Sequence, residues 1–286
     1  MNTKDLTNLL IAGRNADGGW GYYRHKTSRL EPTSWAVLAL TAAGQDGAAA
    51  GAGLGQWPAR AGLLLERAGG EPNYGFQGLA LLALHAAALE HRAGNRALLD
   101  ALQRVKGVAL EPSPINRQDN GIQGWSWIAD TFSWVEPTAW CLLALNTCAP
   151  PWRAQIDPVR IRDAERLLVD RSCLGGGWNY GNSNMLGQEL APYVPTTALT
   201  LLALRDRRGE RVVTEGLEFL ERHATSERSA TALALASCAL RTYGRATAAV
   251  MAALRRQLPI TAALGNHAAV AAALYTLSQG DGDATF

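Results

Sequence analysis

Three segments of the chain repeat one another, and this repetition constrains the fold more than any other feature of the sequence. The first, GGWGYYRHKTSRLEPTSWAVLAL, spans residues 18–40, and the second, QGWSWIADTFSWVEPTAWCLLAL, spans 123–145. The third, GGGWNYGNSNMLGQELAPYVPTTALTLLAL, spans 175–204 and keeps the same start and end around a longer loop. Repetition at this length indicates a fold made of copies of one small structural unit.

One polar position links these three repeats to three weaker ones. It lies seven residues before the last residue of each Ala/Leu-rich run, and its six members are Thr33, Gln77, Thr138, Thr197, Thr231 and His267. We call this set the column. Each member stands where an apolar helix is expected to begin. A threonine there favours N-capping, because its hydroxyl can accept a hydrogen bond from a free backbone amide.

A second set of helices is expected before these runs, with apolar residues on one side and charges on the other. Their expected ranges are 4–13, 56–68, 96–107, 157–171, 211–224 and 245–257. The helices that follow them are apolar nearly all round, which is typical of helices buried on every side. The sequence therefore predicts an all-α fold, an (α/α)6 toroid of six helix hairpins with twelve helices in two concentric rings. We expect one domain over residues 1–286. The alternative, an open solenoid, needs polar end caps that neither terminal repeat carries.

Composition and motifs exclude several classes of partner. The 27 basic and 25 acidic residues are interspersed, so no basic patch for nucleic acid is expected. No apolar run has the length of a transmembrane segment or a signal peptide, and we expect a cytoplasmic protein without a transmembrane segment. The four cysteines and five histidines show no paired metal-binding spacing. No metal and no other cofactor is therefore expected.

The segments NADGGWGYY, EPTSWAVLAL, QGWSWIADTFSWVEPTAWCLLAL, CLGGGWNYGN and TALTLLAL resemble the repeats of squalene–hopene cyclases, related class II terpene cyclases and the β subunits of protein prenyltransferases. The resemblance spans the chain and is weaker in repeats two, five and six. It implies an α/α toroid whose central cavity accommodates an isoprenoid or another long apolar small molecule. Squalene–hopene cyclases have a second helical domain that completes their site, so the resemblance also allows a protein partner that would supply it.

Class II cyclases carry a D-x-D-D-T-A motif whose middle Asp protonates an alkene or an epoxide. The aligned stretch here, WVEPTA, keeps one acid of three, Glu136, and repeat one has Glu31 at the same place. The resemblance implies that Glu136 is the proton donor, and Asp130 in the preceding loop is the second candidate acid. The alternative is that both glutamates are structural features of the repeat. The candidate ligand-binding residues are Glu31, Trp35, Trp134, Thr138, Trp140, Thr197 and His267.

Other family features are absent or have a structural alternative. In the prenyltransferases an Asp-x-Cys pair and a His hold zinc, but Asp170 and Cys173 have the wrong spacing to join His267 as such a set. His267 has a structural alternative, a capping role. For the tryptophans of the GW loops, Trp20, Trp125 and Trp178, we expect packing between outer helices, with the ring N–H bonded to a neighbouring repeat.

Three functions remain open. The first is a metal-independent cyclase that uses protonated Glu136, and the second is a non-catalytic module of cyclase descent that binds an isoprenoid, a lipid or a peptide. The third is a carbohydrate-active toroid that uses paired carboxylates such as Asp130 and Glu136.

Overall fold

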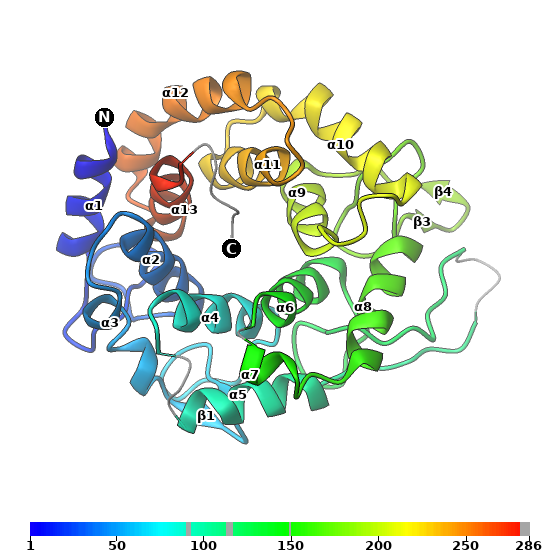
Figure 1. Ribbon diagram of the computed structural model, residues 1–286, viewed down its shortest axis with the longest axis horizontal. Helices are drawn as coiled ribbons and strands as arrows, with labels where there is room; N and C mark the ends of the chain where they lie inside the picture. The colour runs from blue at the N-terminus through cyan, green and yellow to red at the C-terminus, as the bar shows by residue number, and fades with distance from the viewer. Residues whose placement is uncertain (90–92, 113–116, 149, 281–286) are drawn as a thin grey trace.

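A closed inner ring of helices forms the centre of the molecule. The computed structural model describes residues 1–89, 93–112, 117–148 and 150–280. In this described part the inner helices are α2 (Leu30–Ala42), α4 (Gly75–Ala86), α6 (Val135–Thr147), α9 (Val194–Ala203), α11 (Ala230–Thr242) and α13 (His267–Ser278). Each packs against the next, and α13 packs against α2, so the ring closes (Figure 1). The predicted toroid is confirmed.

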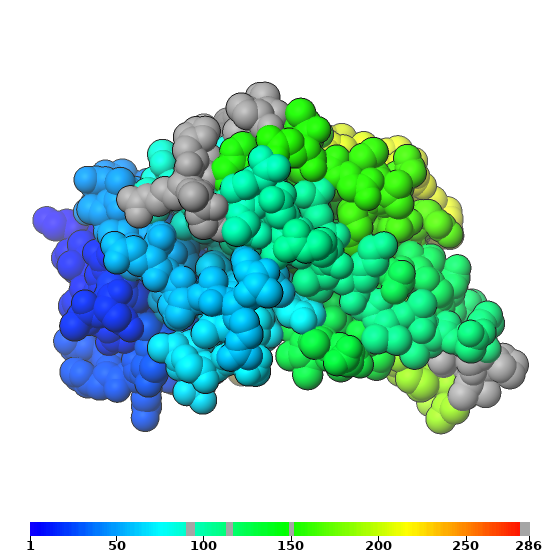
Figure 2. All heavy atoms as spheres, turned by 90° about the horizontal axis from the view of Figure 1, so that it is seen from below, coloured from blue at the N-terminus to red at the C-terminus, as the bar shows by residue number. Residues whose placement is uncertain are grey.

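An outer ring covers these helices. Its helices are α1 (Thr3–Ala12), α3 (Gly47–Ala50), α5 (Ala93–Arg104), α8 (Pro158–Asp170), α10 (Arg211–His223) and α12 (Ala248–Leu264), and the short α7 (Pro150–Arg153) lies between α6 and α8. Seen from below, the outer surface runs from the first repeat at the left to the third and fourth at the right (Figure 2). Within the described ranges, no helix is both long and apolar enough to cross a membrane.

The second repeat departs from the predicted pattern, because the outer helix expected over 56–68 is wrong. The chain forms the short α3, the 3-10 turn η1 (Leu54–Gln56) and a hairpin of β1 (Ala59–Arg60) with β2 (Leu63–Leu64). Glycines are frequent in the stretch before this hairpin and lower helix stability. Leu63 and Leu64 are buried from strand positions, so their apolar character alone misidentified the element. A second hairpin, β3 (Asn184–Met185) with β4 (Gln188–Glu189), lies in the long loop of repeat four.

The threonines of the column hold the GW loops instead of capping helices. The N-cap residues of α2, α6 and α9 are Arg29, Trp134 and Tyr193, so the capping interpretation is wrong for these three helices. The Thr33, Thr138 and Thr197 hydroxyls each accept the backbone N–H of the loop tryptophan at 2.9, 3.0 and 2.9 Å. A buried backbone amide left unpaired is costly, so this bond fixes each loop on its inner helix.

The loop tryptophans connect each loop to the outer helix before it. The ring nitrogens of Trp20, Trp125 and Trp178 donate to the carbonyls of Leu10, Leu102 and Leu168, at 2.7, 2.9 and 2.5 Å. These carbonyls belong to α1, α5 and α8 of the same repeats, so the expected bond to a neighbouring repeat is wrong. All three indoles are fully buried, in agreement with the predicted packing role.

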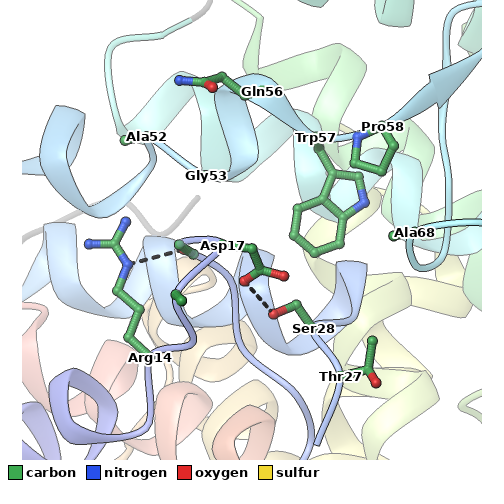
Figure 3. A pocket seen from close by; sticks show the side chains of 12 residues that line it. Arg14, Asp17, Thr27, Ser28, Ala52, Gly53, Gln56, Trp57, Pro58 and Ala68 are labelled. Carbon is green, nitrogen blue, oxygen red and sulfur yellow. Dashed lines mark hydrogen bonds between the residues drawn. The ribbon is translucent and has the colours of Figure 1, made fainter.

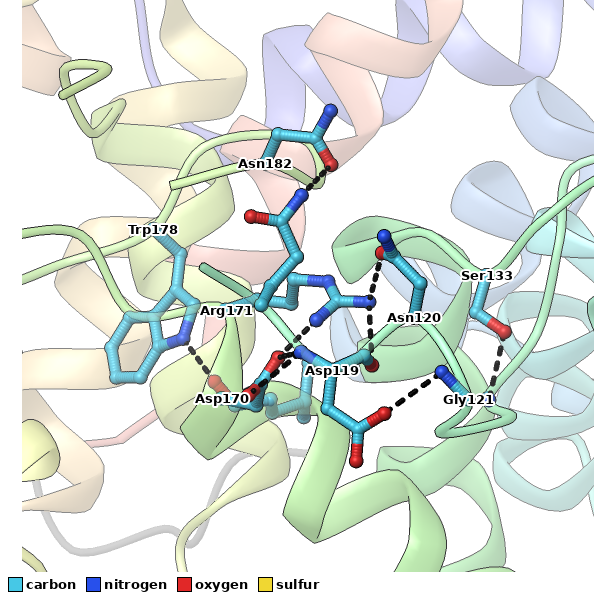
Figure 4. Close-up of polar contacts among 11 residues, drawn as sticks. Asp119, Asn120, Gly121, Ser133, Asp170, Arg171, Trp178 and Asn182 are labelled. Atoms are coloured by element: carbon cyan, nitrogen blue, oxygen red, sulfur yellow. Dashed lines mark hydrogen bonds and ion pairs between the residues drawn. The ribbon is translucent and has the colours of Figure 1, made fainter. Parts of the chain in front are cut away.

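Arg171 fixes the long loop of repeat three against α8. Its guanidinium pairs with Asp170 and donates to the Asp119 carbonyl at 3.2 Å and to Asn120 Oδ1 at 3.3 Å (Figure 4). The Arg171 side chain is only 4% exposed, so these acceptors replace the water it loses on burial.

Candidate active site on the inner face of the ring

Two copies of one short motif place the candidate site. EPTSW at 31–35 opens α2, and EPTAW at 136–140 opens α6. In each copy the glutamate and the tryptophan are four residues apart, and residues at this spacing lie on the same helix face. The site therefore contains two Glu–Trp pairs, one from each helix.

The two tryptophans meet on the inner side of the ring. The Trp35 and Trp140 rings are arranged edge to face, with centroids 5.6 Å apart. Since α4 stands between α2 and α6 in the ring, this contact lies on the face that the helices turn toward the axis. Tyr275 of α13 is a third ring, 6.3 Å from Trp35. All three rings are at most 5% exposed, so the surroundings of Glu136, whose carboxyl group is bonded by the Trp140 side chain, are aromatic.

These surroundings raise the pKa of Glu136 to about 7. Burial is the main cause, because an apolar setting disfavours the carboxylate. The negative charge of Glu31 adds to the increase, and a hydrogen bond from the Trp140 side chain opposes it. The two glutamates, which lie far apart in the sequence, thus interact in the folded protein.

Burial also raises the pKa of Glu31, while a hydrogen bond from the Tyr22 hydroxyl opposes this increase. Burial and the Glu31 charge raise the pKa of Tyr22, so this phenol stays a donor at neutral pH. Arg29, the nearby cation, pairs with Glu66 at 2.6 Å. Near neutral pH the arrangement can hold a protonated Glu136 carboxyl group at the Trp140 side chain.

Two of the predicted site residues lie in the loop before α6. Asp130 is exposed, at φ 60°, and its charge acts on Tyr74. The carboxyl group whose charge acts on Glu136 is that of Glu31. Trp134 is half-buried and stacks on Phe132, with centroids 4.8 Å apart.

Three other predicted site residues make structural contacts. Thr138 and Thr197 are fully buried beneath their GW loops. His267 is 3% exposed, and its Nδ1 lies 2.7 Å from the carbonyl oxygen of Gly21. Burial lowers the pKa of His267, which favours the neutral imidazole. In these contacts the three side chains face the loops of the ring.

Tyr22 and Tyr275 were not predicted from the sequence. Tyr22 follows Trp20 in the GW-x-aromatic pattern, which is a signal that could have been used. Tyr275 has no counterpart at its position in the strong repeats, so only the closure of the ring reveals it. Among the described residues, no three His, Cys, Asp or Glu side chains gather to hold a metal ion.

Solved structures define the class of toroid: the chain has a terpene-cyclase-like fold. The type II terpene cyclase MstE from Scytonema superposes with a TM-score of 0.57 at 14% identity, over 96% of this chain and 97% of that one. A variant of it in complex with its substrate, geranylgeranyl dihydroxybenzoate, gives 0.58 at 13% identity over 96% of both chains. A protein from Actinoplanes gives 0.63 at 15% identity, over 96% and 97%. No protein-family model and no curated protein sequence matches the chain.

Proposed function

We propose that the chain binds an isoprenoid or a similar apolar molecule on the inner face of its ring and starts its cyclisation by proton donation from Glu136. The observation that carries this proposal is the pairing of Glu31 and Glu136 beside Trp35 and Trp140. The fold supports it, because a terpene cyclase of the same fold has been solved in complex with geranylgeranyl dihydroxybenzoate as substrate and with merosterolic acid A as product.

The proposed role of each group follows from its chemistry. With a pKa of about 7, a substantial fraction of Glu136 is protonated near neutral pH and is available as a general acid. The Trp35 and Trp140 rings are buried and pack edge to face, and the Trp140 side chain bonds the carboxyl group of Glu136, so the two rings would hold the acid in position. Tyr22 fixes the carboxyl group of Glu31. No step of this proposal needs a metal ion.

The acid strength favours one substrate class. A carboxyl group with a pKa near 7 is a weak acid, because burial and Glu31 both destabilise its anion. Such an acid protonates an epoxide oxygen more readily than an unactivated alkene carbon, since the oxygen is more basic and ring opening drives the reaction. We therefore favour an isoprenoid with a terminal epoxide.

The second candidate is a non-catalytic binding module, and the duplication of the motif favours it. Glu31 and Glu136 occupy equal places in two repeats, and Pro137 stands where the class II cyclase motif has an acid. A neutral Glu136 carboxyl group can donate a hydrogen bond to a polar end of a bound molecule without reacting with it. A partner subunit that completes the site stays a prediction for both candidates. No observation favours the carbohydrate-active alternative with Asp130.

Incubation with polyprenyl compounds tests the proposal. The purified chain is mixed with farnesol, geranylgeraniol and squalene, and with their terminal epoxides, and products are separated by gas chromatography with mass spectrometry. Cyclised product from the epoxides supports the cyclase. Binding of these compounds without product, measured by tryptophan fluorescence, favours the module. The absence of both binding and product would contradict both candidates.

A further inference from the structure

A surface cavity lies between the first two repeats, apart from the inner face of the ring. It has a volume of about 400 Å³, which falls in the usual range for small-molecule sites. The loop between α1 and α2 forms one side, and the chain from α3 to β1 forms the other (Figure 3). Small residues leave it open: Ala16, Gly18, Ala52, Gly53 and Ala68.

Trp57 provides a fixed aromatic wall. Its ring nitrogen donates to the Leu65 carbonyl at 2.8 Å, which holds the ring orientation. A Cβ added at Gly19 would lie 2.8 Å from the Trp57 ring, so the ring edge is packed against the opposite loop. The indole is half-buried and lines the cavity. Such a ring is a platform on which a ligand ring can stack.

Two charged side chains at the cavity each have one polar atom that makes no hydrogen bond within the described residues. Asp17 Oδ1 accepts from Ser28 Oγ at 2.8 Å and from the Gly19 amide at 3.0 Å, and its Oδ2 has no partner among the described residues. Arg14 donates through Nε to the Gly18 carbonyl and through Nη2 to the Ala49 and Ala50 carbonyls. Its Nη1 has no partner within the described ranges. The cavity therefore offers an acceptor and a donor in fixed positions.

We propose that this cavity binds a neutral sugar, with the sugar ring on Trp57 and its hydroxyl groups bonded to Asp17 and Arg14. One positive and one negative charge line the cavity, so its net charge favours neither an anion nor a cation. A ligand that satisfies both groups must donate and accept hydrogen bonds, and sugar hydroxyls do both. The apolar C–H face of a sugar ring fits an indole. The proposal does not depend on the function of the inner site.

Saturation-transfer NMR tests this with methyl glucoside, methyl galactoside, methyl mannoside and N-acetylglucosamine as probes, and with glycine as a zwitterion of similar polarity. We expect at least one sugar to receive saturation, and glycine to receive none. Ala68→Leu should weaken transfer, because an exposed alanine tolerates the larger side chain, which narrows the cavity. Asp17→Asn should weaken binding roughly tenfold, since the amide keeps one acceptor but loses the free carboxylate oxygen.

Asp206→Asn is the matched control, since it also removes an exposed carboxylate but lies outside this cavity. It should leave sugar binding unchanged. The proposal is overturned if no sugar binds, if glycine binds in their place, or if Ala68→Leu binds sugar as the wild type does. Circular dichroism of each variant confirms that loss of binding is not loss of folding.

Discussion

His267 Nδ1 lies 2.7 Å from the carbonyl oxygen of Gly21, and this contact joins the last repeat to the first. The backbone amide of His267 adds a second bond, to the Tyr22 carbonyl at 2.8 Å. In repeat two, Gln77 occupies the same column position and bonds the Leu64 amide and carbonyl at 2.8 and 2.9 Å. Gln77 bonds the backbone that precedes it in its own repeat, and His267 bonds the loop of repeat one, which follows it around the ring. In both contacts the side chain bonds a backbone carbonyl, so a glutamine is a reasonable replacement for the histidine.

We expect His267→Ala to lower the free energy of unfolding by about 1 to 3 kcal/mol, because it leaves a buried carbonyl unpaired. His267→Gln should retain more of the stability, since its amide can donate to the Gly21 carbonyl. Urea denaturation at neutral pH measures both. Equal loss in the two variants would contradict a role for this hydrogen bond.

The same histidine gives a prediction on pH. Its pKa in the folded state is lowered by burial from 6.5, so below that pH the unfolded chain binds a proton that the folded chain does not. The contribution of His267 to stability is therefore lost as the pH falls below about 6.5. His267→Gln removes the titrating group, and with it this loss of stability at acidic pH. The free energy of unfolding of the variant, relative to that of the wild type, should therefore rise as the pH falls. A difference between the two that is constant with pH would contradict this prediction.

Glu136 should have the opposite effect on stability. Its pKa rises from an ordinary 4.5 to about 7 on folding, so between these values the folded chain keeps a proton that the unfolded chain has lost. Stability contributed by Glu136 is present at low pH and is lost as the pH rises to about 7, by up to about 3 kcal/mol. Glu136→Gln cannot ionise. It should match the wild type at acidic pH and be more stable above neutrality, as measured by urea denaturation across this pH range.

The two glutamates should differ in how strongly their substitution lowers catalytic activity. If the chain cyclises an isoprenoid, Glu136→Gln should abolish product formation while the protein remains folded, because the amide keeps the shape but is not an acid. Glu31→Gln should reduce turnover much less. The product assay with polyprenyl epoxides measures both variants beside the wild type. Equal, partial losses in the two variants would show that neither glutamate is the specific proton donor.

The hydroxyl of Thr138 should stabilise the fold through its bond to the Trp125 amide, 3.0 Å long. Thr138→Val keeps the shape and removes the acceptor, so we expect a loss of about 1 to 3 kcal/mol in the free energy of unfolding. Thr138→Ser is the matched control and should keep the bond. Guanidinium denaturation compares them. A serine variant as unstable as the valine variant would show that the methyl group, and not the hydroxyl, matters.

Much of the fold could be read from the sequence, because helix periodicity and repetition are local properties. The apolar runs at the column residues gave the inner helices, and one-sided apolar patterns gave most of the outer ones. The failure at 56–68 has a local cause as well, since buried leucines suit a strand and a helix equally. The threonine roles were misjudged for another reason. Capping is a property of one helix, whereas the bond from Trp20 to Thr33 joins two segments.

The sequence by itself determined the repeat, the two kinds of helix and the two copies of the Glu-Pro-Thr-x-Trp motif. Each of these features depends only on residues that lie close together along the chain. Only the tertiary structure decided that Glu31, and not Asp130, acts on Glu136, and that Trp35 meets Trp140. The physical reason is ring closure. Side chains of α2 and α6 interact because α4 holds the two helices at a fixed distance around the axis, and spacing along the chain does not encode that distance.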